Sequence, residues 1–250
     1  MYWSNPSSGG TIAATCRLSV RMLAGLVAAM PVFSTASGTA PQMQIDHVLL
    51  GIHDLDQGVA DFEALTGVRP VYGGKHPGGT HNALVSLGAG VYLEIIAIQP
   101  GAADTGENSD LKGLRSLEPV GWAVSTSDTD AARAQLEAFG FATSDPEPGS
   151  RITPARTTLS WKTFALHDEF RGAPFFITWS AESPHPSTTS PSGCTLQHWR
   201  IASPAADTLA QLRTALGLKF QVEGDINPSF RVSIHCPKGI VVFETRPEPT

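Results

Sequence analysis

Apolar and polar residues alternate along residues 45–51, at the start of the predicted fold. Val48 and Leu50 fall on one face of this strand and His47 and Leu49 on the other, because successive side chains of a strand point to opposite faces. A histidine on an otherwise apolar strand belongs either to the core or to a site. Which of the two applies depends on the residues that the rest of the chain brings near His47.

The hydrophobic spacing then changes to that of a helix over residues 55–66. Asp54 is a favourable N-cap residue, and Gly67 is typical of the residue that ends a helix. The apolar stripe of the helix consists of Leu55, Val59, Phe62 and Leu65. Three further strands are predicted at residues 68–72, 81–87 and 91–98, the last two as a hairpin.

Two fainter copies of this order follow. The middle copy has strands at 121–126, 157–166 and 174–180 and a helix at 129–139, with Ala132, Leu136 and Phe139 facing inward. The third copy has strands at 195–202, 219–222, 230–235 and 240–245 and a helix that starts at Ser203-Pro204 and stops at Gly217. Repeats of about 50 residues in this order predict an internally duplicated α+β fold.

Polar, proline-containing connectors at residues 100–119 and 183–193 separate the three copies. We therefore expect one domain over residues 45–182, with units at 45–98 and 120–182, and a third unit over residues 194–247.

Residues 1–44 have a different composition. Arg17 and Arg21 precede an apolar run at 22–33, which is followed by small residues, as in a secretory signal. The apolar run is too short to span a bilayer. A disordered leader, or a true start at Met22, is the alternative. Export places the protein in the periplasm or outside the cell; without it the protein is cytoplasmic.

Charge argues against nucleic acid as a partner. All 23 acidic residues, and all but two of the 17 basic residues, follow residue 44. A surface of this sign repels phosphate backbones, and the chain contains no basic run. We expect a small-molecule partner and no membrane contact after leader removal. A homodimer is possible on this sequence.

Three cysteines do not form a framework of disulfides. Cys16 would leave with the leader, and Cys194 and Cys236 could pair only in an exported protein. Two unpaired thiols are the alternative.

A histidine and a glutamate recur at matching positions of two units. Twenty residues separate His47 from Gly67, and 47 separate it from Glu94. His198 lies 19 residues before Gly217 and 46 before Glu244. If the first and last strands of each unit are neighbours, each pair shares one sheet face. Two such units facing each other would place His47, Glu94, His198 and Glu244 around one point.

This set suits a divalent metal such as zinc, nickel, manganese or ferrous iron. Two open coordination positions would bind adjacent substrate oxygens and stabilise an enediolate. Glu94 or Glu244 would carry the proton as the catalytic group. The alternatives are a core or surface histidine at position 47 and a solvated Glu244. The middle unit carries Trp122 and Trp179 at the matching strands, which indicates packing or a pocket wall.

A glycine-rich loop over residues 73–79 leads into the strand at 81–87. His76, Thr80, His81 and Asn82 bring hydrogen-bonding groups to this point, and core packing does not need them. We interpret these four residues as substrate-binding; the alternative is a turn whose side chains cap its own backbone. His185 lies in the second connector, where a surface loop is favoured over closure of a pocket.

The stretches Asp46-His47-Val48, Leu65-Thr66-Gly67 and 90–96 resemble glyoxalase-like members of the vicinal oxygen chelate superfamily. The loop at 74–82, the stretch 176–179 and His185-Pro186 are similar to one glyoxalase-like subfamily. The likeness covers residues 45–200 well and the last unit loosely.

The resemblance implies βαβββ modules that form cupped mixed β-sheets, with helices on the outer faces and a metal site between paired modules. His47 and Glu94 match the ligand positions of the first module. His198 and Glu244 match those of the second only if the third unit pairs with the first, and a third unit departs from the usual even number.

Two functional classes follow. The first is a metal-dependent glyoxalase-like lyase or isomerase acting on a small oxygenated or carbonyl compound, with a dioxygenase as its variant. The second is a metal-free protein that binds a small molecule with the same cup. A structural or regulatory module with a vestigial site is a weaker third hypothesis. Metal content separates the first two classes.

Overall fold

The computed structural model describes residues 41–102, 109–167, 170 and 172–246. The predicted leader at 1–44 lies outside the described residues except for residues 41–44. Within the described ranges, no helix has the length and apolar character needed to cross a membrane.

The first unit folds in the predicted order. Its elements are β1, α1, β2, β3 and β4 (Met43–Gly51, Leu55–Thr66, Val71–Lys75, Thr80–Ser86 and Tyr92–Ile98). The predicted bounds of α1 are confirmed, because Asp54 accepts a hydrogen bond from the backbone N–H of Gln57 and Gly67 ends the helix with a φ of 80°. Of the predicted apolar stripe, Leu55, Val59 and Phe62 are buried, whereas Leu65 is 51% exposed.

The middle unit follows the short 3-10 helix η1 (Ser109–Gly113). Its elements are β5, α2, β6, β7 and β8 (Glu118–Thr126, Thr129–Ala138, Glu147–Ile152, Thr158–Phe164 and Phe175–Trp179). Ala132 and Leu136 are buried as predicted, but Phe139 lies just beyond α2 and is 51% exposed. Strand β6 was not predicted, because it contains Pro148 and Gly149 and lacks apolar alternation.

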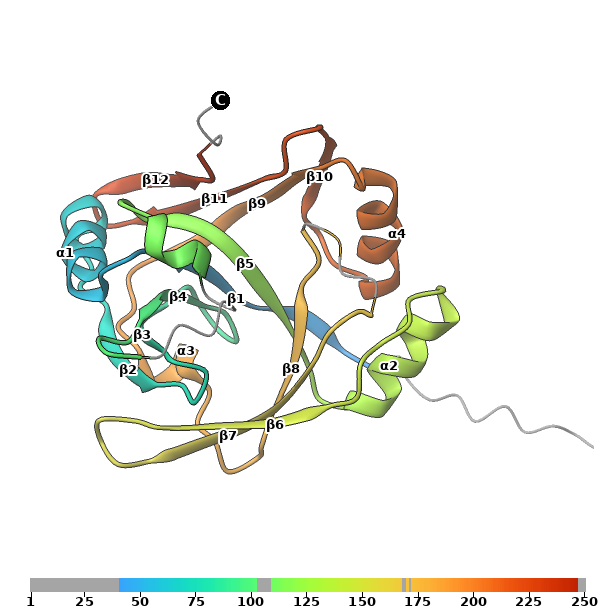
Figure 1. The fold of residues 1–250 in the computed structure, drawn as a ribbon, viewed down its shortest axis with the longest axis horizontal. Helices are drawn as coiled ribbons and strands as arrows, with labels where there is room; N and C mark the ends of the chain where they lie inside the picture. Colours follow the sequence, from blue (N-terminus) through green and yellow to red (C-terminus); the bar gives the residue numbers. More distant parts are fainter. Residues whose placement is uncertain (1–40, 103–108, 168–169, 171, 247–250) are drawn as a thin grey trace, which may run out of the picture. The chain divides into compact units, whose positions relative to one another are not determined.

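These two units share one eight-stranded sheet with the order β2-β3-β4-β1-β5-β8-β7-β6 (Figure 1). Strand β1 pairs in parallel with β4 and antiparallel with β5, so the first strands of both units meet at the centre. Strand β8 is parallel to β5, so the middle unit repeats the strand order of the first. At the two edges, Arg151 of β6 donates a hydrogen bond to the carbonyl oxygen of Gly73 in β2. The sheet is therefore a nearly closed cup.

The third unit has a different strand order. Its elements are β9, α4, β10, β11 and β12 (Thr195–Ser203, Ala206–Leu216, Gln221–Gly224, Ser229–Cys236 and Gly239–Glu244). They form a four-stranded sheet in the order β10-β9-β11-β12, so β11 separates the first strand from the last. The helix ends at Gly217 as predicted, but its N-cap is Ala205 rather than Ser203. A short helix α3 (Pro186–Thr189) lies in the preceding connector.

The third unit packs on the outer face of the cup. Trp122 of β5 lies in register with Val48 of β1, on the face opposite His47. Its ring centroid is 6.1 Å from that of Trp199 and 4.9 Å from that of Phe220. One hydrophobic core includes buried residues of both sheets. The prediction of an α+β fold with cupped mixed sheets and outer helices is confirmed.

Cys194 and Cys236 form a disulfide that links the start of β9 to the end of β11. The paired state, one of the two open alternatives, is the one in this structure.

Candidate functional site

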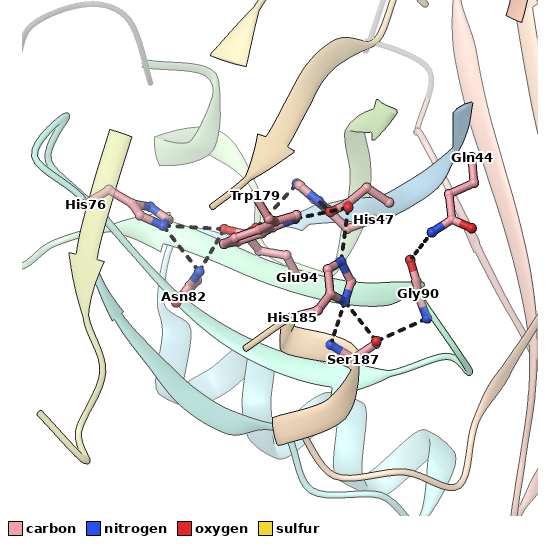
Figure 2. Close-up of polar contacts among 10 residues, drawn as sticks. Gln44, His47, His76, Asn82, Gly90, Glu94, Trp179, His185 and Ser187 are labelled. Atoms are coloured by element: carbon pink, nitrogen blue, oxygen red, sulfur yellow. Dashed lines mark hydrogen bonds and ion pairs between the residues drawn. The ribbon is translucent and has the colours of Figure 1, made fainter. Parts of the chain in front are cut away.

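His47 and Glu94 lie next to each other on the inner face of the cup (Figure 2). In the parallel ladder of β1 and β4, His47 is in register with Tyr92, and Leu49 with Glu94. The Nε2 atom of His47 is 3.6 Å from Oε2 of Glu94. This separation is too long for a direct hydrogen bond. The structure therefore brings two of the predicted site residues together, with both side chains buried.

A β-bulge places Asp46 beside its neighbour His47. In the ladder with β5, Ile45 and His47 pair with consecutive residues, so Asp46 is the extra residue. Nδ1 of His47 donates to Oδ1 of Asp46 at 2.7 Å. Because a carboxylate only accepts, Nδ1 donates a proton to this bond, and Nε2 is the nitrogen on the side of Glu94.

The second carboxylate oxygen of Asp46 accepts from two further residues. These donors are Nε1 of Trp179 at 3.1 Å and Nε2 of His185 at 3.0 Å. The backbone N–H of Ser187 donates to Nδ1 of His185, which leaves the proton of that ring on Nε2. Burial acts to raise the pKa of Asp46, but the hydrogen bonds and the electrostatic attraction of His185 and His47 outweigh it and lower the pKa to about 2. Asp46 is a carboxylate at neutral pH.

The predicted loop contributes His76 and Asn82 to the site. Nδ2 of Asn82 donates to Oε1 of Glu94 at 3.0 Å and lies 3.3 Å from Nε2 of His76. Nδ1 of His76 is 2.9 Å from the hydroxyl oxygen of Thr80, so this hydrogen bond holds the ring on the side opposite Nε2. Burial lowers the pKa of His76 more than the charge of Glu94 raises it. The imidazole of His76 is therefore neutral at neutral pH.

His81 lies on the other face of β3. Thr80 and Asn82 flank it in the strand, so its side chain points away from theirs. Its ring centroid is 6.2 Å from that of Tyr72, and it does not line the cavity. The structure contradicts the prediction that His81 contacts the same ligand as Asn82.

His198 and Glu244 do not reach this site. They lie on β9 and β12 of the four-stranded sheet, with β11 between them, and both are exposed. Glu244 instead pairs with Arg200 at 3.3 Å and with Arg231 at 3.0 Å. The predicted four-residue site, with Glu244 as a proton carrier, is wrong because the third unit covers the outside of the cup. The middle unit supplies the wall that faces His47.

A cavity of about 210 Å³ lies over His47 and Glu94. Its walls are largely aromatic, with Tyr92, Trp161, Phe175 and Trp179 among the lining residues. The His47 ring stacks on Tyr92 at a centroid distance of 4.5 Å. A larger surface hollow of about 810 Å³ shares Trp161 and Trp179 but has no histidine, so the chemistry belongs to the smaller cavity. The prediction that Trp179 forms a pocket wall fits this geometry.

Arg151 of β6 is the charged cavity residue that sequence reasoning missed. It is 6% exposed, lines the cavity and donates to the carbonyl oxygen of Gly73. Burial lowers the pKa of its guanidinium, and the charge of Glu94 partly opposes this effect. The sequence around Arg151 is polar and irregular and does not indicate a site. Arg151 lines the cavity because β6 pairs with β7 and so becomes part of the cup.

The donor atoms do not fit the predicted metal site. Across the part of the chain that the structure describes, no three His, Cys, Asp or Glu side chains are arranged to hold an ion. Nε2 of His47 and Oε2 of Glu94 are two suitable donors, but catalytic metal sites usually take three protein ligands. Nε2 of His76 and Oε1 of Glu94 both contact the amide of Asn82 instead.

Residues 45–217 match the model of a glyoxalase-like domain family. A crystal structure of a hypothetical protein from Staphylococcus aureus is similar over 81% of this chain and 85% of that chain, with 15% identity and a TM-score of 0.55. A methylmalonyl-CoA epimerase of Streptomyces coelicolor in complex with 2-nitronate-propionyl-CoA aligns with 56% of this chain and 98% of its own, with 21% identity and a TM-score of 0.39. The epimerase of Mycobacterium tuberculosis aligns with 58% and 90%, with 19% identity and a TM-score of 0.37. No curated protein matches. The solved structures show likeness of fold alone.

Proposed function

This chain belongs to the glyoxalase-like domain family, and we propose that it is a lyase- or isomerase-type enzyme that moves a proton on a small carbonyl compound. One observation carries the proposal. Nε2 of His47 and Oε2 of Glu94 face each other across 3.6 Å at the floor of a cavity of about 210 Å³. A base whose other nitrogen is held by a buried carboxylate is the arrangement that acid–base catalysis uses.

Each residue of the site has a part in this reaction. Asp46 keeps the proton of His47 on Nδ1, so that Nε2 is free to accept a proton from the carbon next to the substrate carbonyl. The electron pair of the broken C–H bond moves onto the carbonyl oxygen and forms an enolate. Glu94, whose other oxygen Asn82 holds, exchanges protons with His47 or the substrate. Return of a proton to the opposite face of that carbon completes an epimerisation, and its return to the former carbonyl carbon of a hydroxycarbonyl compound completes an isomerisation.

Deuterium exchange tests this proposal without knowledge of the natural substrate. We expect wild-type protein in D₂O to incorporate deuterium next to the carbonyl of at least one member of a panel of small aldehydes, ketones and 2-oxo acids, followed by proton NMR. If no member exchanges faster than in buffer while the protein still binds ligands in the cavity, the metal-free binding hypothesis replaces the enzyme.

Divalent metals are common among glyoxalase-like proteins, but the donors described above do not fit one here, and no step of this mechanism passes through an ion. Dialysis against EDTA is therefore expected to change the thermal midpoint very little and the deuterium exchange by less than about twofold, since one well-placed imidazole and carboxylate suffice for proton transfer. Loss of exchange on dialysis, with recovery on addition of zinc, nickel, manganese or ferrous ions, would contradict this expectation.

Export from the cytoplasm is part of the proposal. The disulfide between Cys194 and Cys236 supports it, because such bonds persist in oxidising compartments. In protein recovered from cells without reductant, we expect both thiols to resist alkylation. The bond closes a loop of 42 residues, so reduction should lower the free energy of unfolding by about 2–4 kcal/mol in a denaturant titration. Free thiols in freshly recovered protein would contradict export.

A further inference from the structure

Arg151 is a buried cation without a carboxylate partner among the described residues. It is 6% exposed, and its one hydrogen bond within the described chain runs from Nη1 to the carbonyl oxygen of Gly73. No Asp or Glu side chain there lies within ion-pair distance of it. A guanidinium carries five N–H donors and stays charged in proteins. Most of its donors are therefore not used by the fold.

The unused donors face the cavity. None of the Arg151 nitrogens is both sealed from solvent and unpaired, so the nitrogens without a protein partner border open space. That space is the cavity over His47 and Glu94, which Arg151 lines. Buried charges are normally paired or hydrogen-bonded, because an isolated one costs several kcal/mol. A ligand oxyanion would supply the missing partner.

The size of the cavity and the residues of its walls further restrict which ligands can bind. A volume of about 210 Å³ equals roughly seven water molecules at their liquid volume of ~30 Å³. The part of a ligand that lies inside this cavity is therefore small. The aromatic side chains of Trp161, Phe175 and Trp179 suit a planar or apolar body.

We infer that Arg151 binds a carboxylate group of the substrate and that the substrate class is a small carboxylic acid bearing a carbonyl group. This inference rests on the proposed function, in which His47 and Glu94 act on the carbon next to that carbonyl. The guanidinium fork matches a carboxylate with two parallel hydrogen bonds. Anchored in this way, the acid lies in the cavity that His47 and Glu94 also line.

A purely structural role is the competing explanation for Arg151. Its bond to Gly73 joins the edge strands β2 and β6, and a side chain at Gly73 would collide with Oδ1 of Asn82. If Arg151 only joins these two strands, its substitution should lower stability, and the cavity should show no preference for charged ligands. Charge-selective binding separates the two explanations.

The test compares benzoate with benzamide, which have the same shape and number of non-hydrogen atoms and differ in charge. Binding is followed through quenching of tryptophan fluorescence, to which Trp161 and Trp179 in the cavity wall respond. In wild type, benzoate should bind at least about tenfold more tightly than benzamide, as a charge-assisted pair requires. This comparison needs no variant, so it stands even if substitution of Arg151 disturbs the fold.

In Arg151→Gln, benzoate affinity should fall about 10–100-fold while benzamide affinity changes little. Arg200→Gln is the matched control, because it removes the same charge from the exposed sheet of the third unit and should leave both affinities unchanged. Equal binding of benzoate and benzamide to wild type would overturn the inference, as would unchanged benzoate binding in a folded Arg151→Gln protein. If wild type binds benzoate selectively but catalyses no deuterium exchange on any carbonyl compound, Arg151 still forms an anion-binding site. The proposed enzymatic function is then wrong.

Discussion

Replacing Glu94 with glutamine is expected to slow deuterium exchange about 10²–10⁴-fold, the usual contribution of a positioned acid or base. Glutamine keeps the shape of the side chain, and its amide oxygen can still accept the hydrogen bond that Asn82 donates to Oε1. It cannot exchange a proton with His47 or the substrate. The loss should therefore fall on the chemical step, measured as the exchange rate at saturating substrate.

Benzoate binding provides the internal check on this variant. Glu94→Gln removes a negative charge from the cavity, so benzoate should bind as tightly as in wild type or more tightly. Glu63→Gln makes the same change at an exposed position of α1, where Glu63 pairs with Arg69 at 2.5 Å, and should exchange at the wild-type rate. Wild-type exchange in Glu94→Gln would remove Glu94 from the mechanism.

Replacing Asp46 with asparagine is expected to reduce exchange by about 10²–10⁴-fold, although Asp46 acts on the substrate only through His47. Its carboxylate accepts from His47, Trp179 and His185 at once. An asparagine amide has one oxygen and one NH₂ group. The NH₂ group opposes two donors if it faces Trp179 and His185 but only one if it faces His47, so it turns toward His47. His47 then loses the hydrogen bond that keeps its proton on Nδ1, and Nε2 is no longer reserved as the base.

The pH dependence of stability separates this positioning role from simple misfolding. The pKa of Asp46 falls from an ordinary value of 3.8 to about 2 on folding. A lowered carboxyl pKa stabilises the protein above the unfolded value and loses that contribution as the pH falls through the folded value. At about 1.4 kcal/mol per pKa unit, Asp46 contributes roughly 2 kcal/mol near neutral pH, which disappears between about pH 4 and pH 2.

Asp46→Asn should therefore show a shallower loss of unfolding free energy across that interval, measured by urea titration at each pH. Asp54→Asn is the control, because asparagine caps helix α1 as well as aspartate and the change in charge is the same. If Asp46→Asn keeps both the wild-type exchange rate and the wild-type acid slope, the hydrogen bonds around Asp46 have no part in catalysis.

Local chemistry in the sequence was sufficient for helix α1 and for the alternation of strand β1. Helix α1 has the bounds that its apolar spacing, its Asp54 cap and Gly67 predict, because these signals act within a few residues of one another. The alternation that separates His47 and Leu49 from Val48 and Leu50 likewise puts the first two residues in the cavity and the others in the core. The hydrophobic period and the capping residues can be read from the sequence because they depend only on residues close together in the chain.

The site was only partly accessible to sequence reasoning. The neighbourhood of His47 and Glu94 follows from the spacing within the first unit and from the resemblance to a known family, whereas the positions of His185 and Arg151 follow from contacts between distant segments. His185 lies in a stretch with the composition of a connector, yet it is hydrogen-bonded to Asp46 across 139 positions. Arg151 lies on an edge strand that no periodicity marks.

The sequence by itself determined helix α1, most of the strands, the α+β class, and one histidine–glutamate pair with His76 and Asn82 of its supporting loop. Tertiary structure alone decided that the middle unit faces His47 and that the third covers the outer face, with β11 between the strands of His198 and Glu244. It also decided that a bulge turns Asp46 toward His47. Strand order and register depend on hydrogen bonds and packing between residues far apart in the chain, which hydrophobic period, caps and spacing do not encode.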